Sequence, residues 1–282
     1  MLASSWFKRA LTKEKWSESG RHESDGRFHV YAEDWDAEAF LIVLNIFHLR
    51  NRQVPRTVTL EMLAKVAVLV DYYECGEAIE VFTTMWLHDL KQMPMPTTLC
   101  RELILWIWVA WTFELSEQFK LATMVAISQS AVTIQTLGLP IPSKISSEIV
   151  RKRYQVIESV IEPLHALLDK YRNSKYVCPR NDDLSFQCGS FLLGALTREL
   201  DRLDLFSPRP EIPFYKITFD SLCKLVQNIM SPEWRHSGYS SHGYSSQNIL
   251  HACSLKTEVT GIVNKATAGL EGLDHDAIGY RT

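Results

Sequence analysis

Glycine is scarce in this 282-residue sequence, long apolar runs are missing, and no excess of basic charge is present. The 12 glycines are about 4% of the chain, against a usual ~7%, which favours long helices over a turn-rich sandwich or barrel. The longest nearly unbroken apolar run, Leu103–Phe113, is about half as long as a membrane-spanning helix, so we interpret it as a buried core helix. The 30 basic and 33 acidic residues indicate neither nucleic acid nor a membrane as a partner.

Several motifs of catalysis and secretion are also missing. The sequence contains no Gly-x-Ser-x-Gly, no phosphate-binding Gly-x-x-x-x-Gly-Lys-Ser/Thr and no Gly-x-Gly-x-x-Gly, so no enzyme class is indicated. The segment after Met1 lacks the pattern of a secretory signal. We therefore predict an intracellular protein, cytoplasmic or nuclear, with six reduced cysteines. The basic cluster Arg151-Lys152-Arg153 is interpreted as the solvent-facing side of a helix.

The apolar residues that are present recur mostly at helical spacing, which predicts a mainly α-helical fold. A short strand is expected at 27–33, where apolar and polar residues alternate. Residues 237–247, rich in serine and glycine, predict a mobile loop. Pro163 is expected to kink or divide the long helix that contains it. The predicted helices are 4–11, 36–47, 60–72, 76–90, 101–114, 117–130, 143–172, 188–205 and 219–230.

Several of these segments resemble a known family. The stretches DWDAEAFLIVLNIFHLR, VTLEMLAKVAVLVDYYEC and EAIEVFTTMWLHDL resemble the helical half of a BTB/POZ domain, and SSWFKRAL resembles the helix that precedes it. The rest resembles the helical extension of fungal BTB/POZ proteins. The stretches that carry this second resemblance are CRELILWIWVAWTF, LGLPIP, CGSFLLGALTREL, LFSPRPEIPF and HACSL.

The resemblance implies an organisation and a function. It implies a partial BTB/POZ domain over 1–93, and this domain is an α+β remnant that lacks the N-terminal strands. An all-α extension over 94–282 is expected to follow it. It also implies a protein–protein interaction module, an adaptor for a cullin-type ubiquitin ligase or a transcription-factor complex. The family's usual dimer-forming helix belongs to the lacking part, so a homodimer of the usual kind is not implied. In such proteins the partner-facing surface includes the positions that correspond here to Trp6, Phe7, Tyr31 and Trp35.

One set of residues has the side chains that zinc prefers. Cys178, Cys188, His251 and Cys253 offer three thiols and an imidazole, and structural zinc takes four such donors. Their spacing is not that of a standard zinc motif. Two hypotheses therefore stand beside the interaction module: a structural zinc site, or a zinc- or thiol-dependent enzyme. The alternative is that these residues are ordinary thiols and a surface histidine.

Overall fold

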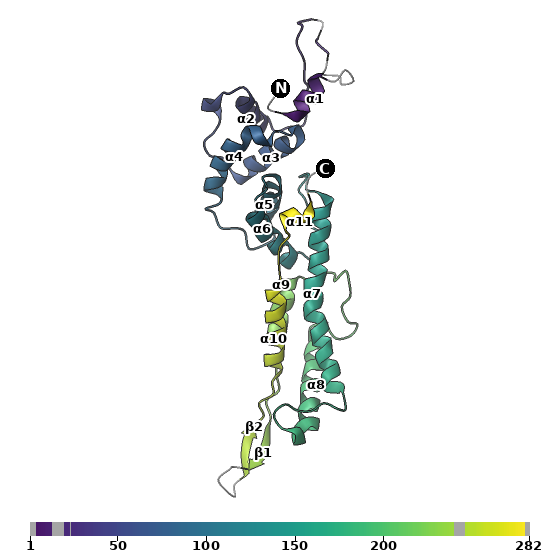
Figure 1. The fold of residues 1–282 in the computed structure, drawn as a ribbon. Coiled ribbons are helices and arrows are strands. Elements are labelled where there is room, and N and C mark those ends of the chain that lie inside the picture. Colours follow the sequence, from purple (N-terminus) through teal and green to yellow (C-terminus); the bar gives the residue numbers. More distant parts are fainter. Residues whose placement is uncertain (1–3, 13–19, 23, 240–245, 280–282) are drawn as a thin grey trace. The chain divides into compact units, whose positions relative to one another are not determined.

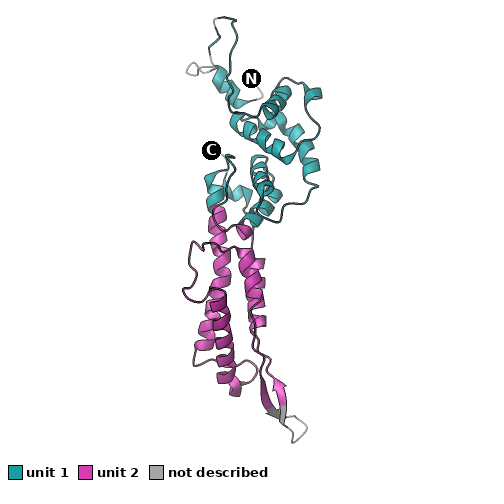
Figure 2. Ribbon diagram, turned by 180° about the vertical axis from the view of Figure 1, so that it is seen from behind, with its two compact units in different colours: residues 1–126, 134–147, 272–282 teal, residues 127–133, 148–271 magenta. Residues whose placement is uncertain are grey.

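The computed structural model describes residues 4–12, 20–22, 24–239 and 246–279. Within them the protein is mainly α-helical, as predicted, and its one sheet has two strands. The chain forms two compact units (Figures 1 and 2). Unit 1 contains residues 1–126, 134–147 and 272–282, and unit 2 contains residues 127–133 and 148–271. The two helices that follow residue 93 lie wholly (101–112) or mostly (116–126) in unit 1.

Unit 1 is built from α-helices of 15 residues or fewer and the start of α7. The first turn of α2 is capped by Asp36, whose carboxylate accepts a hydrogen bond from the backbone N–H of Ala39, as the sequence predicts. Thr59 caps α3 in the same way. The elements are α1 (Ser5–Thr12), α2 (Ala37–Phe47), the 3-10 turn η2 (Asn51–Gln53), α3 (Leu60–Tyr73), α4 (Gly76–Leu90), α5 (Arg101–Thr112), most of α6 (Ser116–Gln129), the start of α7 and α11 (His275–Ile278).

The core of unit 1 is built around α5. Every residue from Leu103 to Trp111 is buried, which confirms the prediction that this helix is surrounded on all sides. The Trp108 ring is fully buried, and its Nε1 donates a hydrogen bond to the carbonyl oxygen of Ala64 in α3, 3.2 Å away. The indole therefore contributes both apolar area and a satisfied polar atom to the contact between α3 and α5.

Unit 2 consists of long helices and one hairpin. Its core is lined by α7, α8, α9 and α10. The strands β1 and β2 are antiparallel, with Arg235 opposite Leu250 and Ser237 opposite Asn248. The elements are α7 (Ser143–Arg172, in unit 2 from Glu148), the 3-10 turn η3 (Asp182–Leu184), α8 (Ser185–Arg202), α9 (Phe219–Gln227), β1 (Arg235–Tyr239), β2 (Ser246–Leu250) and α10 (Leu255–Ala268).

A buried arginine joins three segments of unit 2. Arg153 of α7 is 1% exposed, so the prediction that this residue faces solvent is wrong. Its Nε donates to the carbonyl oxygen of Ser130 at 2.7 Å. Its terminal nitrogens donate to the carbonyl oxygens of Pro213, Phe214 and Ile217 at 2.6–3.1 Å. These carbonyl oxygens lie in irregular segments, outside the hydrogen-bond pattern of a helix or sheet. The guanidinium supplies the N–H donors for them.

Three local predictions need correction. Residues 27–33 form no strand; among the described residues, Phe28 makes only an isolated bridge with Arg21. In the predicted mobile loop, residues 237–239 and 246–247 belong to the hairpin, while 240–245 lie outside the described residues. Pro163 does not divide α7, which continues through it. None of the described helices has the length and apolar character needed to cross a membrane.

Candidate metal centre

Three segments of unit 2 bring four metal-binding side chains together. Cys178 lies between α7 and η3, Cys188 lies in α8, His251 follows β2, and Cys253 precedes α10. One ligand atom from each lies within 4.8 Å of all the others. Cys178, Cys188 and His251 are buried and Cys253 is half-buried, so the expectation of a surface histidine is wrong. The structure thus brings together the whole set that the sequence analysis selected.

Two distances in this Cys3His cluster are close to those between ligands of one zinc ion. The sulfurs of Cys178 and Cys253 are 3.6 Å apart, and the Cys178 sulfur is 3.4 Å from Nε2 of His251. With zinc bonds of about 2.3 Å to sulfur and 2.0 Å to nitrogen, a tetrahedral site separates two sulfurs by about 3.8 Å and a sulfur and a nitrogen by about 3.5 Å. Small side-chain movements are therefore enough to fit the ion.

Hydrogen bonds fix the loop that carries Cys178. Its backbone N–H donates to the hydroxyl of Ser185 at 2.9 Å, and that hydroxyl donates to the carbonyl oxygen of Asp182 at 2.6 Å. The side chain of Asn181 accepts a hydrogen bond from the N–H of Asp183 and so begins η3. Because Ser185 is one turn before Cys188 in α8, these contacts place the two thiols side by side.

Gly189, next to Cys188 in α8, leaves room for the ring of Tyr176. The hydroxyl of Tyr176 lies 3.4 Å from the Cys188 sulfur. A Cβ atom at Gly189 would lie 3.0 Å from the Tyr176 ring, so a side chain at this position would displace the ring. Gly189 therefore allows Tyr176 to pack on α8 and reach the thiol. Such outer contacts orient the ligands of metal sites.

The hairpin positions the remaining two ligands. The backbone N–H of His251 donates to the carbonyl oxygen of Trp234, and the two rings stack with their centres 4.3 Å apart. Ser254 caps α10, and Ser231 accepts a hydrogen bond from the N–H of Leu255 at 2.9 Å. Cys253 is thereby held between the end of the hairpin and the start of α10.

The surroundings of the four side chains favour different protonation states. Burial opposes ionisation of Cys178, but hydrogen bonds from the backbone N–H groups of Arg180 and Asn181 and from neighbouring thiols outweigh it and lower its pKa. Burial, together with the neighbouring thiols, raises the pKa of Cys253 to about 12. Burial, reinforced by His236, lowers the pKa of His251 and favours the neutral imidazole that binds metal. A bound cation supplies the charge that ionises the remaining thiols.

No protein-family model, no curated protein and no solved structure matches this chain. The resemblance to BTB/POZ proteins therefore stays a prediction from the sequence alone.

The four predicted partner-binding residues lie in two different environments in unit 1. Trp6, Phe7 and Trp35 are half-buried around Tyr73. Phe7 stacks on the Tyr73 ring with centres 5.0 Å apart, and Nε1 of Trp35 donates to the Tyr73 hydroxyl at 3.1 Å. Tyr31, by contrast, is 75% exposed. Three of the four side chains therefore take part in holding unit 1 together, and Tyr31 is the one fully available to a partner.

A second group of possible metal ligands lies in the described part of unit 1. His22, Asp25 and His29 bring their ligand atoms within 4.8 Å of one another, and all three are exposed. They are not among the metal ligands predicted from the sequence. His29 bonds the Asp25 carboxylate at 3.1 Å and His22 bonds Ser24 at 2.7 Å. These contacts account for the arrangement as a hydrogen-bonded turn.

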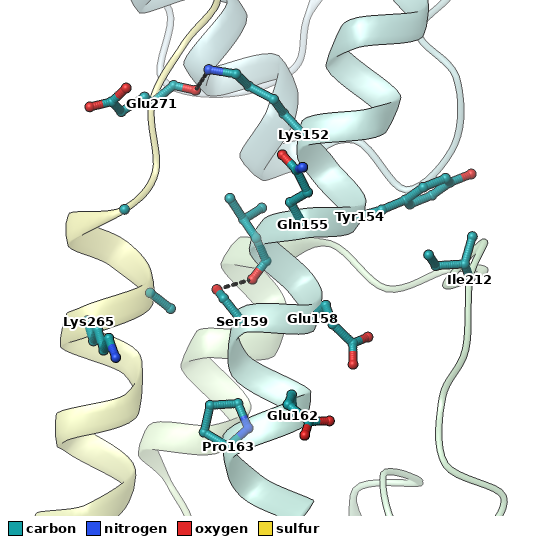
Figure 3. A pocket seen from close by; sticks show the side chains of 13 residues that line it. Lys152, Tyr154, Gln155, Glu158, Ser159, Glu162, Pro163, Ile212, Lys265 and Glu271 are labelled. Atoms are coloured by element: carbon teal, nitrogen blue, oxygen red, sulfur yellow. Dashed lines mark hydrogen bonds between the residues drawn. The ribbon is translucent and has the colours of Figure 1, made fainter.

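A cavity of unit 2 lies between α7 and α10 and has a volume of about 750 Å³ (Figure 3). Its polar side chains make structural contacts. Lys152 donates to the carbonyl oxygen of Glu271, and Ser159 donates to that of Val156. Glu158 and Glu162 both pair with Arg209. Lys152, Glu158 and Glu162 therefore hold the surrounding segments together.

Proposed function

We propose that Cys178, Cys188, His251 and Cys253 bind one structural zinc ion, and that the protein is a zinc-stabilised helical protein without catalytic activity. The observation that carries this proposal is the convergence of all four ligand atoms within 4.8 Å from three separate segments. Four protein ligands complete a tetrahedral zinc site and leave no position for water or substrate, which favours a structural over a catalytic ion.

The structural role of the proposed ion is to stabilise the attachment of the hairpin. An isolated two-stranded hairpin is marginally stable in water. Here β2 leads directly into His251, and Cys253 follows two residues later. Bound zinc would join this end of the hairpin to the Cys178 loop and to α8, so that ion binding contributes directly to the stability of the fold.

Metal analysis of the purified full-length chain tests the proposal. We expect one zinc per chain in the wild type and a clear loss of bound zinc in Cys188→Ser. Cys223→Ser is the matched control, because Cys223 is a buried cysteine of α9 in the same unit and lies outside the cluster; it should keep one zinc. Cobalt in place of zinc should give a thiolate-to-cobalt absorption band that Cys188→Ser weakens. A folded wild type without stoichiometric metal would overturn the proposal.

A second proposed function is protein–protein interaction of the BTB/POZ type, including the adaptor role that the resemblance implies. Its support in unit 1 is the exposure of Tyr31, which is the most exposed of the four predicted partner-binding residues. Affinity capture with the wild type and with Tyr31→Ala tests it, because this substitution leaves the contacts around Tyr73 intact. Proteins bound by the wild type and lost from the folded variant would support the proposal, and an unchanged set of proteins would count against this surface.

A further inference from the structure

The four ligands of the Cys3His cluster differ in how open they are to small molecules. Cys178, Cys188 and His251 are buried, whereas Cys253 is half-buried. A cavity of about 590 Å³ lies beside it, lined by residues 227–233, 250–254 and Lys256. Both Cys253 and His251 line this cavity, and the other two cysteines do not. A small, uncharged oxidant therefore reaches the Cys253 sulfur first.

A second thiol lies close to Cys253. Its sulfur is 3.6 Å from that of Cys178, and a disulfide needs about 2.05 Å, so the two atoms must approach by about 1.5 Å. Cys253 lies in an irregular segment between the hairpin and α10, which allows this movement. Cys188, in contrast, lies within α8, and its sulfur contacts the Tyr176 hydroxyl. The pair best placed to react is therefore Cys253 and Cys178.

We infer that Cys253 is an oxidation site, and that hydrogen peroxide or a related hydroperoxide joins it to Cys178 in a disulfide. The Cys253 sulfur attacks one peroxide oxygen; an S–O bond forms, the O–O bond breaks, and the departing hydroxide becomes water. The Cys178 sulfur then attacks the Cys253 sulfur; the S–S bond forms, the S–O bond breaks, and a second water leaves. Two thiols lose two electrons, and one peroxide is reduced to two waters. If the sulfurs start as thiolates, solvent supplies two protons.

The consequence for the metal rests on the proposed zinc site. A disulfide removes two of the four ligands, leaving Cys188 and His251, and two ligands do not hold a structural zinc ion. Oxidation should therefore release the ion and detach the end of the hairpin from α8. A reductant such as dithiothreitol, together with added zinc, should reverse both changes.

Treatment of the full-length chain with hydrogen peroxide tests the inference. Disulfides are mapped by mass spectrometry of unreduced peptides, and released zinc is followed with a colorimetric chelator. We expect one Cys178–Cys253 disulfide and one equivalent of zinc per chain. Cys75 and Cys223 serve as internal controls, because both are buried and lie outside the Cys3His cluster; they should stay reduced.

Two variants separate the oxidation from the loss of metal. Cys188→Ser and Cys253→Ser each remove one zinc ligand, yet only Cys253→Ser removes the reacting thiol. We expect the Cys178–Cys253 disulfide in Cys188→Ser and no such bond in Cys253→Ser. A zinc-loaded wild type that forms no disulfide, or one between other cysteines, would overturn the inference and leave the proposed zinc site standing. A metal-free wild type that still forms this disulfide would support the inference and overturn the zinc site.

Discussion

Unit 1 and unit 2 bury their side chains in different ways. In unit 1 an uninterrupted run of nine buried residues, Leu103–Trp111, occupies the centre, and tryptophans supply much of its volume. Unit 2 also has an apolar core, but two irregular regions are attached to it through polar groups. Arg153 holds the carbonyl oxygens of Ser130 and of the 213–217 segment, and the Cys3His cluster lies at the end of the hairpin. The stability of unit 1 should therefore be insensitive to metal, whereas part of unit 2 should depend on it.

Removal of zinc should produce the largest difference between the units. Zinc ligation in small domains contributes roughly 10–16 kcal/mol of apparent binding free energy, and unit 2 has its own apolar core to offset part of the loss. We expect the local unfolding free energy of residues 248–255 to fall by at least ~3 kcal/mol, which makes their amide hydrogens exchange more than ~100-fold faster. Hydrogen-exchange mass spectrometry with and without a chelator measures this change.

The amide hydrogens of α5 are the internal control for this experiment, because α5 belongs to unit 1. They should exchange at the same rate with and without the chelator. Equal acceleration in α5 and in 248–255 would show that the two units do not differ in their dependence on metal.

Truncation of the unit 1 core should have the next largest effect. Trp108→Ala removes a fully buried indole and its hydrogen bond to the carbonyl oxygen of Ala64. We expect a loss of ~3–5 kcal/mol in the free energy of unfolding, measured by chemical denaturation and independent of added zinc. Val81→Ala is the control in the same unit, because Val81 is 79% exposed; it should change stability by less than ~0.5 kcal/mol. A Trp108→Ala effect that varies with zinc would contradict the comparison.

Loss of the buried guanidinium should destabilise unit 2 by a smaller amount. Arg153→Met keeps much of the apolar volume but leaves carbonyl oxygens of two segments without their donor, and each unsatisfied buried group costs ~1–3 kcal/mol. We expect a loss of about 3 kcal/mol in chemical denaturation. Arg151→Met is the matched control on the same helix, since the Arg151 side chain is half-exposed and pairs only with Glu148. Equal effects of both variants would mean that the carbonyl contacts of Arg153 are unimportant.

The sequence predicts unit 1 better than unit 2, for a physical reason. Burial of α5 follows from its continuous apolar run, and the capping role of Asp36 follows from its position before a helix. Arg153 has the same sequence context as its charged neighbour Lys152, and only the tertiary structure places carbonyl oxygens around it. The hairpin lies in a polar, serine-rich segment whose pairing has no alternating apolar signal. The Cys3His set was found by ligand type, but its convergence depends on contacts across 75 residues of sequence.

The smallest expected effect concerns a buried carboxylate of unit 2, and it depends on pH. Glu199 of α8 is 5% exposed. Its Oε2 accepts hydrogen bonds from Arg202 at 2.8 Å and from the backbone N–H of Met230 at 3.1 Å. The hydrogen bond from Arg202 is the main cause that lowers the pKa of Glu199, and the bond from Met230 adds to it. Together they outweigh burial, which opposes ionisation. The pKa of Glu199 in the folded state is therefore below its unfolded value of about 4.3. Its ionised carboxylate stabilises the fold at neutral pH, and this contribution disappears as the pH falls through the folded-state pKa.

Glu199→Gln keeps the size of the side chain and removes its charge. We expect it to lower the free energy of unfolding by about 1 kcal/mol at neutral pH, a modest value because Arg202 is half-exposed and water and salt screen the pair. The difference from the wild type should vanish below the folded-state pKa of Glu199. Asp169→Asn is the control, since Asp169 and Arg172 form an exposed pair at the same spacing on α7; it should have almost no effect. Denaturation at a series of pH values measures both variants, and a Glu199→Gln effect that persists at low pH would assign the loss to packing rather than to charge.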